Sequence, residues 1–129
     1  MHGRSDTILI AGAGIAGLTA AIAFARSGRG VIVVERAPEL EEVGAGLQLS
    51  PNATRLLARF GVLERLEGRA ARPSSVVLRR ASDGREVARI ALGDNAISRW
   101  ASPYLTVHRA DLQAALLETV RATPGIDLR

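Results

Sequence analysis

Three glycines near the N-terminus, Gly12, Gly14 and Gly17, have the spacing that most clearly indicates chemistry in this 129-residue sequence. They form the pattern G-x-G-x-x-G after a short apolar run and before an alanine-rich stretch that favours a helix. The first glycine of such a turn permits a tight bend, the second lets N–H groups approach a pyrophosphate, and the third lets the helix pack closely on the strand. We therefore predict dinucleotide binding here, with Ile15 and Ala16 at the positive end of the helix.

An acidic residue at the expected distance supports this prediction. Glu35 directly follows a second apolar run, and an acidic side chain about 20 residues after such a turn accepts hydrogen bonds from the adenosine ribose. The neighbouring Arg36 is a candidate contact to the adenine or ribose, with an ordinary surface charge as the alternative. The glycine pattern does not distinguish FAD from NAD, so an NAD(P)-dependent dehydrogenase stays open as an alternative.

The elements that must position these residues follow from the apolar pattern. Residues 7–11 and 31–34 are continuous apolar runs, typical of strands buried on both faces of a parallel sheet, and residues 15–26 suit a helix. Two such strands joined by a crossover helix form a parallel, right-handed βαβ unit. Residues 75–80 and 85–92 alternate around an Asp-Gly turn, which predicts an antiparallel hairpin. The predicted fold class is therefore α/β, a Rossmann-like fold with a parallel sheet plus an antiparallel hairpin.

Capping signals assign the remaining segments. Ser50 followed by Pro51 predicts a helix start, and Leu56, Leu57 and Phe60 are expected on the buried face of that helix. The other expected elements are loops at 44–50 and 93–102, a helical piece at 62–66, strands at 104–107 and 126–128, and a helix from an Asp111 N-cap through Val120 with Leu112, Leu116 and Leu117 inward.

Because the strand at 126–128 is expected close to the C-terminus, we interpret residues 1–129 as the incomplete N-terminal part of an FAD/NAD(P)-binding domain.

Composition excludes several kinds of site. The sequence has no cysteine, and its two histidines, His2 and His108, are far apart, so we expect no disulfide and no metal site. It has no lysine, which removes Schiff-base chemistry, a P-loop lysine and the tyrosine-lysine pair of short-chain reductases. The net charge of +4 comes from scattered arginines with few aromatic residues between them, so nucleic-acid binding is not expected.

The apolar stretch of residues 7–25 after Arg4 imitates a secretory signal, but glycines interrupt it and a nucleotide-binding spacing follows. The same run is too broken to provide the roughly 18 apolar residues of a membrane span. We therefore expect a folded, cytoplasmic protein that has no membrane span.

Taken in order, four segments resemble the N-terminal third of FAD-dependent aromatic-ring monooxygenases related to salicylate and 6-hydroxynicotinate hydroxylases. The first segment occurs in all Rossmann-type proteins, whereas the blocks Gly-Ala-Gly-Leu-Gln-Leu-Ser-Pro-Asn-Ala and His-Arg-Ala-Asp-Leu in this order are more specific. The four segments are residues 7–17, 34–36, 44–53 and 107–112.

This resemblance implies FAD as the cofactor, NADH or NADPH as the co-substrate, and O₂ and a small salicylate-like aromatic compound as substrates. It also implies that Arg109 reaches the FAD and that Gly46, Leu47 and Gln48 lie near the flavin. A histidine that some relatives carry in this loop is absent, so 6-hydroxynicotinate chemistry is not expected, and no catalytic residue is assigned. We interpret the isolated chain as an inactive FAD-binding piece of such an enzyme; a nucleotide-binding domain without catalysis is the alternative, and the oligomeric state is not predicted.

Overall fold

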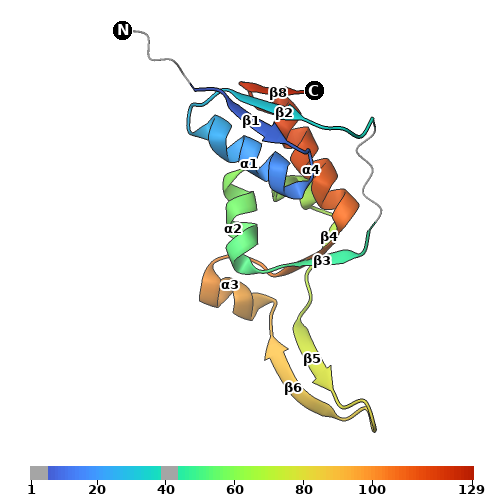
Figure 1. Cartoon of the computed structure of the whole chain (residues 1–129). Coiled ribbons are helices and arrows are strands. Elements are labelled where there is room, and N and C mark those ends of the chain that lie inside the picture. The colour runs from blue at the N-terminus through green and yellow to red at the C-terminus, as the bar shows by residue number, and fades with distance from the viewer. Residues whose placement is uncertain (1–5, 39–43) are drawn as a thin grey trace.

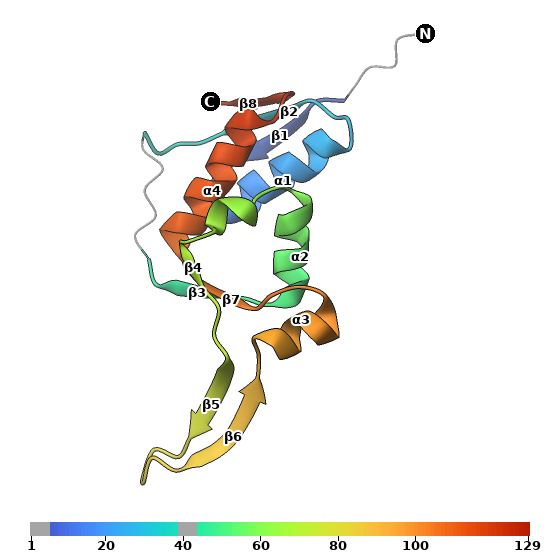
Figure 2. The same cartoon turned by 180° about the vertical axis from the view of Figure 1, so that it is seen from behind.

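The computed structural model of the chain describes residues 6–38 and 44–129. Figures 1 and 2 show a parallel sheet at one end, helices beside it, a second sheet, and a hairpin that projects from the other end. The elements in chain order are β1 (Ile8–Ala11), α1 (Ile15–Arg26), β2 (Val31–Val34), β3 (Gly46–Leu49), α2 (Pro51–Arg59), the 3-10 helix η1 (Glu64–Leu66), β4 (Ala70–Ala71), β5 (Ser75–Arg79), β6 (Glu86–Ala91), α3 (Asp94–Trp100), β7 (Leu105–His108), α4 (Arg109–Ala122) and β8 (Ile126–Leu128).

The parallel βαβ unit expected from the apolar runs is confirmed. β1 and β2 pair in parallel from Ile8 opposite Val31 to Ala11 opposite Val34, and α1 makes the crossover between them. β8, also expected as a strand, pairs in parallel with the other edge of β2, so β2 is the central strand. The residue after β2, Glu35, therefore lies beside the end of β1, where the glycine turn begins.

A second sheet corrects the expectation of a loop at residues 44–50. β3 pairs antiparallel with β7, with Gly46 opposite His108 and Leu49 opposite Leu105, and β4 pairs with the other edge of β7. The glycine-rich sequence of this segment gives a weak strand signal on its own. Its extended conformation depends on a partner strand almost sixty positions later in the chain, which the local pattern does not reveal.

Two expectations about helices are also wrong. Residues 93–102 contain the short helix α3 instead of a loop; Ala96 is its buried residue, too little for an apolar pattern to show. α4 begins at Arg109 with His108 as its N-cap, so Asp111 is not the cap. Asp111 lies in the first turn, where its negative charge favours the positive helix end. None of the helices in the described part of the chain is long and apolar enough to cross a membrane.

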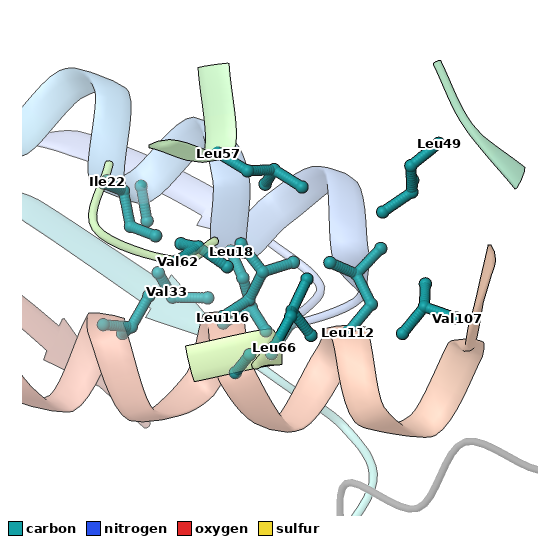
Figure 3. Close-up of a cluster of buried hydrophobic side chains, with 14 of the residues drawn as sticks. Leu18, Ile22, Val33, Leu49, Leu57, Val62, Leu66, Val107, Leu112 and Leu116 are labelled. Carbon is teal, nitrogen blue, oxygen red and sulfur yellow. The ribbon is translucent and has the colours of Figure 1, made fainter. Parts of the chain in front are cut away.

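The core lies where α1 and α4 pack against each other and against the parallel sheet. Leu18 and Ile22 on α1 and Leu116 on α4 are fully buried, and they face one another in Figure 3. Leu57 on α2 is buried as expected, whereas Leu56 is 47% exposed and was wrongly assigned to the buried face. The core also contains Val31, Val33, Val62, Leu66, Leu112 and Val120, with Phe60 and Leu117 partly buried against it.

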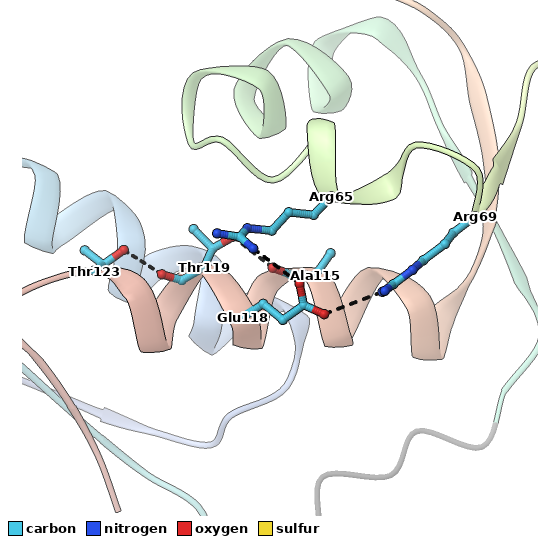
Figure 4. A network of polar contacts seen from close by, with 6 residues as sticks. All are labelled: Arg65, Arg69, Ala115, Glu118, Thr119 and Thr123. Atoms are coloured by element: carbon cyan, nitrogen blue, oxygen red, sulfur yellow. Dashed lines mark hydrogen bonds and ion pairs between the residues drawn. The ribbon is translucent and has the colours of Figure 1, made fainter.

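Polar contacts join α4 to the segment that follows α2. Glu118 forms ion pairs with Arg65 at 3.3 Å and with Arg69 at 3.6 Å (Figure 4). All three side chains are more than a third exposed, so solvent screens the pairs and each contributes less than about 1 kcal/mol. The packing of apolar side chains therefore holds these elements together, and the ion pairs add little.

The β5–β6 hairpin, expected from its alternating sequence, projects from the body of the molecule (Figures 1 and 2). Val76 lies opposite Ile90 and Leu78 opposite Ala88, so these four side chains share one face of the hairpin. Val76, Leu78 and Ile90 are 40%, 61% and 60% exposed. Because water still covers much of this apolar face, it contributes little to the stability of the described fold.

Truncating two leucines tests this division between core and hairpin. We expect Leu116→Ala to lower the free energy of unfolding by about 2–5 kcal/mol, because it leaves a cavity between α1 and α4. Leu78→Ala, at the exposed position, is expected to change it by less than about 0.5 kcal/mol. Urea unfolding followed by circular dichroism measures both values, and a comparable loss for the two variants would contradict the assignment of the core.

Candidate cofactor site

The three glycines of the turn between β1 and α1 have different structural roles. Gly12 has a φ of 102°, which residues with a side chain rarely adopt. A Cβ on Gly17 would lie 1.9 Å from the carbonyl oxygen of Gly12 and 3.4 Å from Ile10 Cγ2, so α1 approaches the turn this closely because Gly17 has no side chain. Around Gly14 there is open space instead, since a Cβ there would meet no described atom within 4 Å.

Backbone donors lie at the start of α1. The Leu18 N–H donates to the Gly14 carbonyl at 2.9 Å, which is the first hydrogen bond of the helix. The N–H groups of Ile15, Ala16 and Gly17 come before that bond in the chain, so they have no acceptor within the helix. No side chain of the described residues caps this end of the helix. Such N–H groups point out of the helix and carry partial positive charge, so an anionic group at the turn would meet backbone donors.

Glu35 holds the turn from the end of β2. One carboxylate oxygen accepts a hydrogen bond from the Ala13 N–H at 2.7 Å, and the other accepts one from the Ala37 N–H at 2.9 Å. The bond from Ala37 lowers the pKa of the Glu35 carboxyl most, followed by the bond from Ala13, while partial burial acts in the opposite direction and Arg36 adds a smaller lowering effect. Each carboxylate oxygen keeps a second lone pair, so Glu35 can accept further hydrogen bonds while it holds the turn.

A hollow adjoins Glu35 on the side of β8 and α4. Its volume is about 480 Å³, and its lining combines the acidic Glu35, the apolar Leu117 and Leu128, and the basic Arg121 and Arg129. A polar group that prefers the carboxylate and a flat apolar group that prefers the leucines can both be accommodated there.

The other expected site residues are brought together by the second sheet. The pairing of β3 with β7 sets Gly46 opposite His108, and Arg109 follows directly as the first residue of α4. The Arg109 side chain runs past Gly44, because a Cβ on Gly44 would lie 3.1 Å from Arg109 Cδ. Two blocks more than fifty residues apart in the sequence thus form one surface at the start of α4.

The individual residues of that surface differ in exposure. Leu47 is partly buried against the core, whereas Gln48 is exposed and its Oε1 accepts a hydrogen bond from the Tyr104 hydroxyl at 2.6 Å. Arg36, beside Glu35, is also exposed.

In the described part of the chain no three His, Asp or Glu side chains gather in a way that could hold a metal ion.

One residue at the turn was missed by the sequence analysis. Gln113 on α4 is only 5% exposed, and its Nε2 donates a hydrogen bond to the Ala13 carbonyl at 3.3 Å. The available signal was an amide at a position of α4 that lies one turn after Arg109 and beside the apolar positions Leu112 and Leu116. The contact itself spans 100 positions and no local pattern indicates it.

The glycine turn, the acidic residue at the end of β2 and the parallel crossover define a dinucleotide-binding α/β domain. The FAD binding domain family model matches residues 5–129, and the chain belongs to this family. FAD is therefore its cofactor. The turn fits such a group, because there is open space around Gly14 at the positive end of α1, which favours an anionic group.

Similar proteins are longer than this chain. The 3-hydroxybenzoate 6-hydroxylase of Polaromonas naphthalenivorans is 42% identical over 120 residues, which are 93% of this chain and 30% of that protein. The 6-hydroxynicotinate 3-monooxygenase of Bordetella bronchiseptica is 37% identical over 122 residues, 95% of this chain and 32% of that protein. The chain thus spans about a third of the length of these relatives.

Solved structures of flavoproteins share the fold. A tetrameric form of 2-methyl-3-hydroxypyridine-5-carboxylic acid oxygenase aligns with a TM-score of 0.81 at 29% identity, over 98% of this chain and 32% of that one. Klebsiella pneumoniae HpxO complexed with FAD and uric acid aligns with a TM-score of 0.76 at 27% identity, over 99% of this chain and 31% of that one. These alignments confirm the fold class predicted from the sequence.

Two glycine-to-alanine substitutions separate folding from cofactor binding. Gly17→Ala is expected to lower the free energy of unfolding by about 1–3 kcal/mol, because the new methyl group overlaps the Gly12 carbonyl. Gly14→Ala is expected to leave stability unchanged or raise it by up to about 1 kcal/mol, yet to weaken FAD binding at least about tenfold by blocking the pyrophosphate. Urea unfolding and flavin-fluorescence titration measure the two effects; full FAD affinity in a stable Gly14→Ala variant would count against a pyrophosphate at this turn.

The lowered pKa of Glu35 predicts a pH dependence of stability. Ionised Glu35 stabilises the folded chain above the usual glutamate pKa of about 4.3, and this contribution is lost as the pH falls through the lowered folded-state pKa. The melting temperature of wild type should therefore exceed that of Glu35→Gln most at neutral pH, and the gap should close in acid. Thermal melts from neutral pH down to strong acid check this, with Glu118→Gln as a control on an exposed ion pair. A gap that stays constant with pH would show that the carboxylate does not hold the turn.

Proposed function

We propose that this chain is the FAD-binding part of a longer flavoprotein monooxygenase that hydroxylates a small aromatic substrate. The observation that carries the proposal is the joining of two distant blocks by β3 and β7, which places Gly46 and Arg109 on one surface at the start of α4. Membership of the FAD binding domain family supports it, as do relatives that are named as hydroxylases and monooxygenases and are about three times as long.

At the nucleotide end, we assign the pyrophosphate to the turn of Gly12, Gly14 and Gly17 and to the N–H groups of Ile15 and Ala16. These groups combine open space at Gly14 with the positive end of α1. The carboxylate of Glu35 has lone pairs left to accept hydrogen bonds from the ribose hydroxyls. The hollow beside Glu35 then suits the adenosine, and the exposed Arg36 lies close enough in the chain to contact its edge.

At the flavin end, we assign contacts to Gly46, Leu47 and Gln48 on β3 and to Arg109. The lack of a side chain at Gly46 lets a flat ring approach the backbone, and Arg109 supplies a positive charge at the start of α4. When bound, FAD supplies the redox and oxygen chemistry, and this chain binds and orients it. No residue of the chain is assigned as an acid or base.

The substrate class is suggested by the relatives and by one structural neighbour. Their names refer to 3-hydroxybenzoate, 6-hydroxynicotinate and 2-methyl-3-hydroxypyridine-5-carboxylic acid, which all carry a ring hydroxyl and a carboxylate. We therefore propose a hydroxylated aromatic acid such as salicylate as substrate, with O₂ and with NADH or NADPH as reductant. The cytoplasm, where reduced nicotinamides are supplied, remains the expected compartment.

Two other functions compete with this one. An NAD(P)-dependent dehydrogenase fits the glycine turn equally well, but the family to which the chain belongs is defined by FAD binding. A nucleotide-binding domain without catalysis fits the chain taken alone, and we propose that the 129-residue piece is itself inactive because it spans about a third of the relatives' length.

The test uses the longer protein that carries this chain, purified and scanned for the absorption of oxidised flavin. We expect bound flavin that NADH or NADPH bleaches at least about tenfold faster when a hydroxylated aromatic acid is present, with a hydroxylated product found by mass spectrometry. Benzoate without the ring hydroxyl is the matched control and should give no product. A protein without flavin that binds NAD tightly would favour the dehydrogenase instead.

A further inference from the structure

We propose that Gln113 is a positioning residue that orients the glycine turn for the pyrophosphate of FAD. The inference concerns a side chain on α4, outside the glycine pattern and outside the turn itself. It rests on the cofactor role proposed for the turn, and it adds a second anchor to the one that Glu35 provides.

Both ends of Ala13 are held by side chains from other elements. Its N–H donates to Glu35 at the end of β2, and its carbonyl accepts the hydrogen bond from Gln113 Nε2 at 3.3 Å. Ala13 is fully buried and lies between Gly12 and Gly14, two residues whose backbones are otherwise free to adopt many conformations. The two hydrogen bonds therefore restrict a segment that its own sequence leaves flexible.

The geometry of the peptide bond lets the hydrogen bond from Gln113 determine the direction of the Gly14 N–H. The Ala13 carbonyl and the Gly14 N–H belong to one planar trans peptide, in which the two groups point in opposite directions. Because the carbonyl points at Gln113, the Gly14 N–H points away from α4. Gln113 thus fixes the direction of a backbone donor at the start of α1, where the pyrophosphate is proposed to bind.

Stability alone does not explain an amide at this position. Gln113 is 5% exposed, and burying an amide costs free energy unless its hydrogen bonds are made, whereas an apolar side chain of similar size has no such cost. Gln113 also lies four residues after Arg109, on the same side of α4. The helix therefore links the turn to the residue proposed to contact FAD near the flavin.

The test compares Gln113→Met, which keeps the length of the side chain but removes the donor, with Thr119→Val on the same helix. Thr119 is also buried, and its hydroxyl donates to the Ala115 carbonyl at 2.8 Å, away from the turn (Figure 4). Each variant loses one buried hydrogen bond and keeps nearly the same side-chain volume. Three quantities are measured for both variants. They are the free energy of unfolding, the hydrogen-exchange rate of the Ala13 amide relative to that of Leu18, and the dissociation constants of ADP and FAD.

We expect Gln113→Met to raise the Ala13 exchange rate about fivefold relative to Leu18 and to weaken ADP and FAD about five- to tenfold, as loss of one hydrogen bond implies. Thr119→Val should lose a similar amount of stability and change neither quantity by more than about twofold. The proposal would be overturned if the Ala13 exchange rate and both affinities of Gln113→Met stayed within twofold of wild type. It would also be overturned if the two variants weakened ADP and FAD binding equally. If wild type binds neither ligand, the assignment of the turn to the pyrophosphate fails, and the exchange rates of the ligand-free chain still decide the role of Gln113.

Discussion

The close approach of α1 to the turn after β1 is the constraint on which the rest of the site depends. With the Gly12 carbonyl 1.9 Å from where a Cβ of Gly17 would lie, no other amino acid permits this contact. The contact places the positive end of α1 beside the end of β1, and the parallel register then places Glu35 next to the same turn. α1 also packs on α4 through Leu18 and Ile22, so this helix serves both the core and the site.

The second sheet connects this arrangement to the proposed flavin end of the site. Its central strand, β7, leads directly into α4, so the strand that pairs with β3 also sets where α4 begins. α4 then packs on α1 through Leu116 and contacts the turn through Gln113. The two ends of the proposed FAD site are therefore connected by one strand and one helix, which explains why a chain this short can define both.

The sequence predicted those parts of the fold whose signals are local. The apolar runs gave β1 and β2 and the glycines gave the turn, because strand burial and backbone freedom depend on neighbouring residues. β3 was missed because its strand character depends on pairing with β7, and α3 was missed because it buries little more than Ala96. Gln113 was missed for the same reason as β3: its partner, Ala13, is distant in the chain. The resemblance to a family named Arg109 and Gly46 as candidate site residues, and the pairing of β3 with β7 shows that the two lie on one surface.

The most direct test of the central claim is a map of amide chemical shifts for the labelled chain during titration with FAD. The account predicts the largest changes at Gly14, Ile15 and Ala16 and around Glu35, with further changes near Gly46 and Arg109. It predicts no change along the β5–β6 hairpin. ADP should reproduce the changes at the turn and at Glu35 but leave Gly46 and Arg109 unaffected. Saturable changes confined to other residues, with an unperturbed glycine turn, would contradict the account.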